Sequence, residues 1–169
     1  MKIAYKIRED LVDSKIDFIP KPAINGSAGY DLSYMPNPTE LKPEKKQSYT
    51  RYAGGKVFLY PGGSVLLSTG INLDLPEGIM GHVCSRSGLA AKNQIFVLNS
   101  PGIVDPEYYG EIKVILYNGG EDTFGIDPCD RIAQLVFVPF YSPKLTLDPN
   151  FDNRVNSLRG NNGFGSTGK

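Results

Sequence analysis

The sequence predicts an all-β fold, a compact barrel or sandwich of short strands. Glycine and proline are abundant, with 19 and 13 among 169 residues, and both are spread along the chain, so that turns interrupt it throughout. Short segments of alternating or β-branched residues recur between these turns. Only the segment S-G-L-A-A-K at 87–92 predicts a helical turn. The length suits one domain with a sizeable core.

The strands are expected in chain order between recognisable turns. Proline-glycine turns are expected at 61–63 and 76–78, and the composition of residues 35–52 predicts a surface loop. Residues 99–118 are expected to form a hairpin that carries Asp105 at its tip and Tyr108 and Tyr109 on its returning arm. The predicted strands are 2–8, 57–60, 64–75 with a break at Gly70, 79–84, 95–98, 111–118, 122–126 and 131–140.

Net charge and cysteine content make some classes of function less favoured for this chain. Eighteen basic and eighteen acidic residues cancel, so net charge favours neither nucleic acid nor a membrane surface as a partner. Cys84 and Cys129 lack zinc-type spacing and are expected to be ordinary reduced thiols. His82 is the single histidine, which leaves no histidine metal cluster. The N-terminal residues lack a long apolar run, and a cytoplasmic location is expected.

The C-terminal segment differs from the rest of the chain. We expect a β domain over 1–147, followed by a flexible, glycine-rich arm over 148–169 that is too polar to pack by itself. A frayed tail is the simplest interpretation. However, Arg159, Phe164 and the hydroxyls of Ser166 and Thr167 stand in a glycine frame, and this set suits an arm that folds over a ligand with phosphates and a flat ring.

Five short motifs are distributed between residues 28 and 168: A-G-Y-D-L at 28–32, S-R-S-G-L-A-A-K at 85–92, N-S-P-G-I-V-D-P-E-Y-Y-G at 99–110, D-R-I-A-Q-L at 130–135 and R-G-N-N-G-F-G-S-T-G at 159–168. In this order they resemble the motifs of the trimeric dUTPases, the deoxyuridine triphosphate nucleotidohydrolases. The resemblance implies a distorted jelly-roll or β-clip barrel and a homotrimer whose active sites lie between subunits, with the arm exchanged onto a neighbour. It also implies magnesium-assisted hydrolysis of dUTP to dUMP and pyrophosphate, which limits uracil in DNA and supplies dUMP for dTTP synthesis.

The resemblance also implies a role for individual residues. Asp105 would be the general base that activates the attacking water, which requires a positioned, ionised carboxylate. Asp31 would hold Mg²⁺ through its water shell, since this ion keeps several waters and needs few protein ligands. The phosphates would be bound by Arg86, Ser87, Gly88 and Gln134. Arg131 is expected to give structural support.

The nucleoside is assigned to the hairpin and the arm. Asn99 would bind the uracil edge together with main-chain groups of Gly102, Ile103 and Val104, because a carboxamide offers both donor and acceptor. Tyr108 would pack against deoxyribose and exclude a 2′-hydroxyl, and Lys113 would also reach the substrate. The arm would contribute Phe164, stacked on uracil, and the phosphate-binding residues Arg159, Gly165, Ser166 and Thr167.

Three features depart from the family pattern. Ser85 stands where proline is usual, and Cys129 stands where glycine usually precedes D-R-I-A-Q. Residues 35–60 exceed the usual connection by roughly ten residues, which predicts an inserted loop of unassigned role.

Two other functions remain open at this stage. A dCTP deaminase has a similar fold and hairpin, but it needs a carboxylate on the returning strand where this chain has Ile115. A nucleotide-responsive regulatory protein would bind the ligand without needing Asp105. A purely structural jelly roll would have no use for Arg159 or Phe164. Substrate tests and deletion of 159–169 separate these alternatives.

Overall fold

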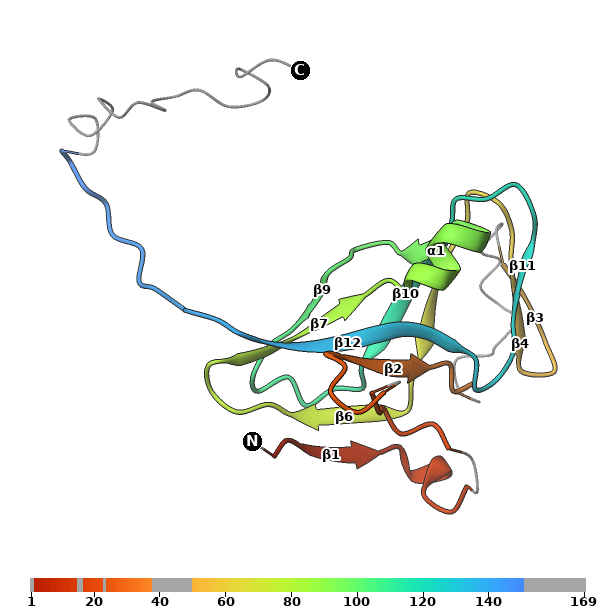
Figure 1. The fold of residues 1–169 in the computed structure, drawn as a ribbon, viewed down its shortest axis with the longest axis horizontal. Coiled ribbons are helices and arrows are strands. Elements are labelled where there is room, and N and C mark those ends of the chain that lie inside the picture. The colour runs from red at the N-terminus through yellow and green to blue at the C-terminus, as the bar shows by residue number, and fades with distance from the viewer. Residues whose placement is uncertain (1, 15–16, 23, 38–49, 151–169) are drawn as a thin grey trace.

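The computed structural model describes residues 2–14, 17–22, 24–37 and 50–150 (Figure 1). The all-β class is confirmed, since strands make up nearly all the regular structure of these residues. The helical segments in the described part are a 3-10 turn, η1 (Glu9–Leu11), and a short helix, α1 (Ser87–Asn93). The strands are β1 (Ala4–Ile7), β2 (Gly29–Ser33), β3 (Thr50–Ala53), β4 (Lys56–Leu59), β5 (Ser64–Ser68), β6 (Ile71–Asp74), β7 (Ile79–Cys84), β8 (Ile95–Val97), β9 (Gly102–Val104), β10 (Lys113–Asn118), β11 (Phe124–Ile126) and β12 (Arg131–Pro139).

The described strands pair into four antiparallel sheets rather than one closed barrel. The largest has the order β2–β12–β7–β9, and the long strand β12 runs through its middle (Figure 1). The other sheets are β1–β6, β5–β10–β8 and β11–β4–β3. Apart from the β3–β4 hairpin, the described ladders join strands that do not follow one another in the sequence. The sheets therefore connect distant parts of the chain.

Alternation along the strands builds the core. Val65 and Leu67 on β5, and Val114 and Leu116 on β10, are at most 2% exposed. Their sequence neighbours within the strands are more exposed, as the period of two requires, except Ser68, which is also buried. A register irregularity between Arg131 and Ala133 lets consecutive residues of β12 turn inward. Each such aliphatic side chain contributes about 1.5–3 kcal/mol of burial free energy.

Three local predictions were wrong. The hairpin at 99–118 does not pair with itself: β9 joins β7 and β10 joins β5 and β8, with Tyr108 and Tyr109 in the loop between. The 35–52 segment is not all surface loop, because Met35 is 2% exposed and Thr50–Ala53 forms β3. That strand belongs to the predicted insertion, whose residues 38–49 lie outside the described part. The 3-10 turn η1 was not expected.

Candidate active site

Asp31 and the predicted phosphate-binding residues Arg86 and Gln134 lie on, or directly after, three neighbouring strands. Asp31 on β2 is the register partner of Gln134 on β12, and Gln134 is in turn the partner of Cys84 at the end of β7. Arg86 follows two residues beyond Cys84. The first, second and fourth motifs, distant in sequence, therefore meet at one end of the largest sheet.

Two arginines share the carboxylate of Asp31. Arg86 donates from Nε to one oxygen at 3.0 Å, and Arg131 donates from a terminal nitrogen to the other at 3.1 Å. Arg86 also donates to the main-chain oxygen of Arg131 at 3.0 Å. The side chains of Asp31 and Arg86 are 17% and 25% exposed, so they remain reachable from solvent. Arg131 is thus part of the site's electrostatics, a role beyond the general structural support expected from sequence.

Gln134 fixes the loop that carries Arg86. Its amide nitrogen donates to the main-chain oxygen of Ser85 at 2.9 Å. The hydroxyl of Ser85, which replaces the usual proline, accepts the Val97 amide at 2.9 Å and so ties the loop to β8. Gln134 also occupies the space above Gly29, where a Cβ would overlap with its side-chain oxygen. A larger residue at the glycine of the first motif would have to displace this side chain.

Ser87 and Gly88 are the first residues of α1, and both are exposed. A Cβ built at Gly88 would meet no other atom of the described chain within 4 Å. Packing within one chain therefore does not explain a glycine here, whereas close approach of a ligand or a second chain to the Gly88 backbone would.

The predicted uracil-binding groups are also close together. The amide nitrogen of Asn99 lies 3.2 Å from a Cβ built on Gly102, so this side chain covers the start of β9. Gly102 and Val104 are buried against β7, while Ile103 is 53% exposed. Asp105 follows directly, with an exposed side chain.

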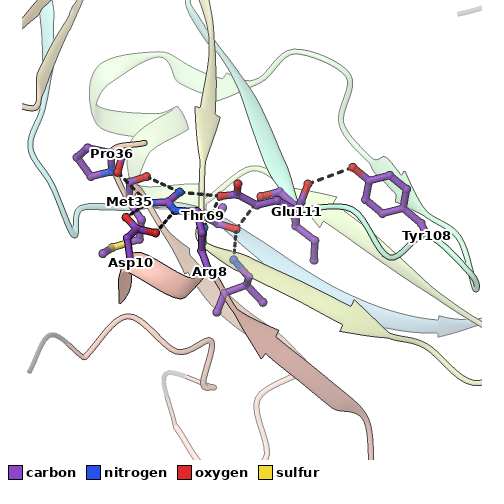
Figure 2. A network of polar contacts seen from close by, with 10 residues as sticks. Arg8, Asp10, Met35, Pro36, Thr69, Tyr108 and Glu111 are labelled. Carbon is purple, nitrogen blue, oxygen red and sulfur yellow. Dashed lines mark hydrogen bonds and ion pairs between the residues drawn. The ribbon is translucent and has the colours of Figure 1, made fainter. Parts of the chain in front are cut away.

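Tyr108 lies across the chain that follows the loop (Figure 2). Its hydroxyl donates to the main-chain oxygen of Glu111 at 3.1 Å, and its ring is next to Gly110, where a Cβ would lie 2.6 Å from the hydroxyl oxygen. The residue is 49% exposed, so part of the ring remains available for a ligand. Lys113 begins β10 opposite Ser68 and is partly exposed.

The two halves of the predicted site lie toward opposite ends of β7. Strand β9 runs antiparallel to β7, with Gly102 opposite Val83 and Val104 opposite Gly81. Asp105 therefore lies beyond Gly81, and five residues of extended chain, roughly 16 Å, separate Gly81 from Arg86. Asp105 and Arg86 of one chain are therefore carried at opposite ends of β7.

Five predicted arm residues, Arg159, Phe164, Gly165, Ser166 and Thr167, lie outside the described residues. Their assignment remains a prediction.

The described residues fit a magnesium ion carried by the substrate better than a resident metal. They include no group of three or more His, Cys, Asp or Glu side chains able to hold a metal by themselves. Asp31 is a single carboxylate beside the guanidinium groups of Arg86 and Arg131. In proteins, Mg²⁺ is commonly bound through one or two carboxylates together with substrate phosphates. No helix of the described chain is long and apolar enough to cross a membrane.

Comparison with known proteins agrees with these motifs. The dUTPase family model matches residues 49–168. The deoxyuridine 5'-triphosphate nucleotidohydrolase of Chlamydia caviae is 37% identical over 152 residues, covering 89% of this chain and 91% of that protein. The enzyme of the same name from Brucella abortus is 44% identical over 113 residues, covering 67% of this chain and 70% of its own.

Solved structures show the same fold. The dUTPase of Staphylococcus bacteriophage 80alpha with dUPNHPP superposes with a TM-score of 0.75 at 25% identity, over 99% of both chains. A dUTPase variant from phage phi11 of S. aureus, which coordinates a structural Mg(II) ion, superposes with a TM-score of 0.68 at 20% identity, over 90% of this chain and 99% of its own. The jelly-roll class predicted from the motifs is thereby confirmed.

Proposed function

Because the chain belongs to the dUTPase family, we propose that it hydrolyses dUTP to dUMP and pyrophosphate at sites shared between the subunits of a homotrimer. The observation that carries the shared site is the separation of Asp105 from Arg86 along β7. A site that needs both groups takes Asp105 from one chain and Arg86 from another. A closed three-fold ring supplies each such pair once per subunit.

The phosphate half would bind and orient the triphosphate. Arg86 would leave Asp31 to donate to phosphate oxygens, and Arg131 would remain as the partner of the Asp31 carboxylate. Ser87 and the Gly88 amide would donate from the start of α1. Gln134 has a second amide hydrogen besides the one given to Ser85, and it would point this donor at a phosphate. Asp31 would hold Mg²⁺ through its water shell, and the ion would supply positive charge that offsets the charge of the three phosphates.

The hydrolytic step requires one positioned water. Asp105 would orient this water and take its proton as the water oxygen attacks the α-phosphorus, and the bond from that phosphorus to the bridging oxygen of pyrophosphate breaks. Asn99, with the backbone of Gly102, Ile103 and Val104, would hold the uracil edge, and the half-exposed ring of Tyr108 would pack against deoxyribose. Lys113 would contact the substrate from β10.

The arm, proposed as 148–169, would complete the site from a third chain. Phe164 would stack on uracil, a contact typically worth about 1–3 kcal/mol per base. Arg159, Gly165, Ser166 and Thr167 would enclose the terminal phosphates and exclude water other than the nucleophile. The domain ahead of it is proposed as 1–147.

An apolar outer sheet face supports the trimer. On β5–β10–β8, the outward residues Leu66 and Ile115 are register partners, as are Phe96 and Tyr117, whose rings lie 5.3 Å apart. Leu66 and nearby Leu98 are each 50% exposed. Removing such an apolar face from water is energetically favourable, and we propose that a neighbouring subunit packs against it. Free Cys84 and Cys129 suit a cytoplasmic enzyme, which would limit uracil in DNA and supply dUMP for dTTP synthesis.

Subunit complementation tests the shared site. Asp105→Asn and Arg86→Gln chains should each be nearly inactive alone. After unfolding and reassembly as an equal mixture, about a quarter of the sites should combine an intact Asp105 with an intact Arg86, and activity should recover to about that fraction. If both groups served one chain's own site, no mixture would recover, because every chain lacks one of them.

Substrate selectivity tests the reaction. Pyrophosphate release should occur from dUTP with Mg²⁺, and should be lost with chelator and be far slower from dCTP, dTTP and UTP. Release of ammonia from dCTP would instead identify a deaminase. Binding of dUTP without any turnover would point to a regulatory protein and would refute the hydrolase.

A further inference from the structure

A partly buried ion pair lies at the end of the loop that carries Tyr108. Arg8, at the end of β1, donates from a terminal nitrogen to a carboxylate oxygen of Glu111 at 3.1 Å, and their side chains are 16% and 14% exposed (Figure 2). The two residues are 103 positions apart in sequence. Desolvating such a pair costs about as much as its attraction returns, so stability alone explains it poorly.

Glu111 is held from two sides. The carboxylate oxygen bound by Arg8 also accepts the Gly70 amide at 2.6 Å. The next residue is clamped too, since the Thr69 hydroxyl donates to the Ile112 oxygen at 2.6 Å and the Ile112 amide donates to the Ile71 oxygen at 2.8 Å. The chain at 111–112 is therefore fixed to the bend between β5 and β6.

Arg8 is held by the surrounding backbone. It donates to the main-chain oxygen of Pro36 at 2.8 Å, and its Nε donates to Asp10 at 2.6 Å. Its own amide donates to the Gly70 oxygen at 2.9 Å. The guanidinium thus links Asp10 and Pro36 to Glu111, and its contacts with the first two fix the position from which it holds the Glu111 carboxylate (Figure 2).

The position of Tyr108 depends on this anchored chain. The hydroxyl of Tyr108 binds the main-chain oxygen of Glu111, the same residue whose side chain Arg8 and Gly70 hold. At the other end of the loop, the Tyr108 amide donates to the Asp105 oxygen at 3.3 Å. A shift of Glu111 would therefore move the phenol ring relative to Asp105 and to the sugar of a bound nucleotide.

We infer that Glu111 and Arg8 are positioning residues that set the sugar selectivity of the site by fixing the Tyr108 ring. This inference rests on the proposed function. The ring excludes a 2′-hydroxyl only if it cannot retreat, and a displacement of the order of 1 Å is enough to change transition-state contacts strongly. The ion pair holds the Glu111 main chain and thus the ring against such retreat.

The test compares dUTP with UTP in charge-neutral variants. The double variant Arg8→Met with Glu111→Gln keeps an acceptor for the Gly70 amide and leaves no buried charge. We expect its ratio of kcat/KM for dUTP over UTP to fall roughly tenfold, mainly through faster use of UTP, while kcat for dUTP changes little. The control is Lys56→Met, which removes an ion pair to Asp127 that makes no contact with Glu111 or Tyr108, and it should leave the ratio unchanged.

A mutant cycle separates positioning from general loosening. If Glu111 acts through the phenol, adding Tyr108→Phe to Glu111→Gln should lower the ratio little beyond either single variant. In the variant that combines Arg8→Met with Glu111→Gln, an unchanged dUTP-over-UTP ratio together with a lowered melting temperature would overturn the inference. The ion pair would then have a structural role only. Wild-type protein that hydrolyses neither nucleotide would instead refute the proposed function, a result distinguishable before any variant is made.

Discussion

The side chain of Gln134 on β12 lies over Gly29 on β2, in the space that a Cβ at position 29 would occupy. A Cβ at this position would overlap with the Gln134 side-chain oxygen, and the same side chain donates to the main-chain oxygen of Ser85 beside Arg86. The glycine of one motif, the glutamine of another and the loop of a third are therefore one packed unit.

Gly29→Ala should disturb this unit. The added methyl group must displace the Gln134 amide, at a typical overpacking cost of about 1–3 kcal/mol in the free energy of unfolding. Because the loop of Arg86 loses its support from Gln134, KM for dUTP should also rise. Denaturant titration and steady-state kinetics measure both effects, and Gly88→Ala is the control for stability, since its Cβ meets open space. Equal stability of Gly29→Ala and wild type would contradict the packed contact.

Asp105→Asn should bind dUTP but turn it over poorly. The amide keeps the size of the side chain while removing the base, and loss of a general base typically costs about 10²–10⁴ in kcat. Calorimetric binding of a non-hydrolysable dUTP analogue should be close to that of wild type. Full turnover by this variant would refute the assignment of Asp105.

Position 129 should favour glycine over alanine. Cys129 has a φ of 72°, in the left-handed region, where the usual family residue is glycine. Cys129→Ala and Cys129→Gly both lose the sulfur, but only alanine retains a Cβ in that conformation, at a cost of about 1 kcal/mol. Thermal unfolding should therefore rank Gly above Ala. The opposite order would mean that the turn relaxes to negative φ in the variants.

Acid should remove a contribution from Asp10. The hydrogen bond from Arg8 holds the pKa of Asp10 below its ordinary value. The carboxylate thus stabilises the fold fully above the unfolded pKa near ~3.9, and this contribution is lost as the pH falls through the lower folded pKa. Asp10→Asn should be less stable than wild type at pH 6, and the difference should vanish in strong acid. A difference that persists there would have another cause.

Much of the fold follows from local patterns. The period of two in β7 and β10 and the turns after Tyr60 and Leu75 place most strands within one or two residues of those observed. The broken strand around Gly70, with its φ of 74°, was also predicted correctly. The pairing of strands was harder to predict from the sequence, because it depends on packing surfaces far away in the chain. The expected pairing of the segment around β9 with β10 was wrong for this reason, since β9 pairs with β7.

The residues of the candidate site also divide into those that local motifs predict and those that only the fold reveals. The motifs contain the residues that meet around Asp31 and those that cluster near Gly102, and the structure brings each group together. The Arg8–Glu111 pair has no local signal, because neither residue lies in a pattern that indicates the other. Burial of Met35 was also missed, since the residues that follow it are prolines and polar residues, while its amide donates to the main-chain oxygen of the distant Ser68.

The distance between Asp105 and Arg86 within one chain has a consequence for the protein in dilute solution. With the active site shared between subunits as proposed, a newly folded single chain would hold only incomplete sites and would be inert. Catalysis would begin only when three chains meet, so the initial rate after strong dilution should rise far more steeply than in proportion to chain concentration. The cell would then set the amount of activity through assembly as well as through synthesis, and an isolated or truncated chain would hydrolyse nothing.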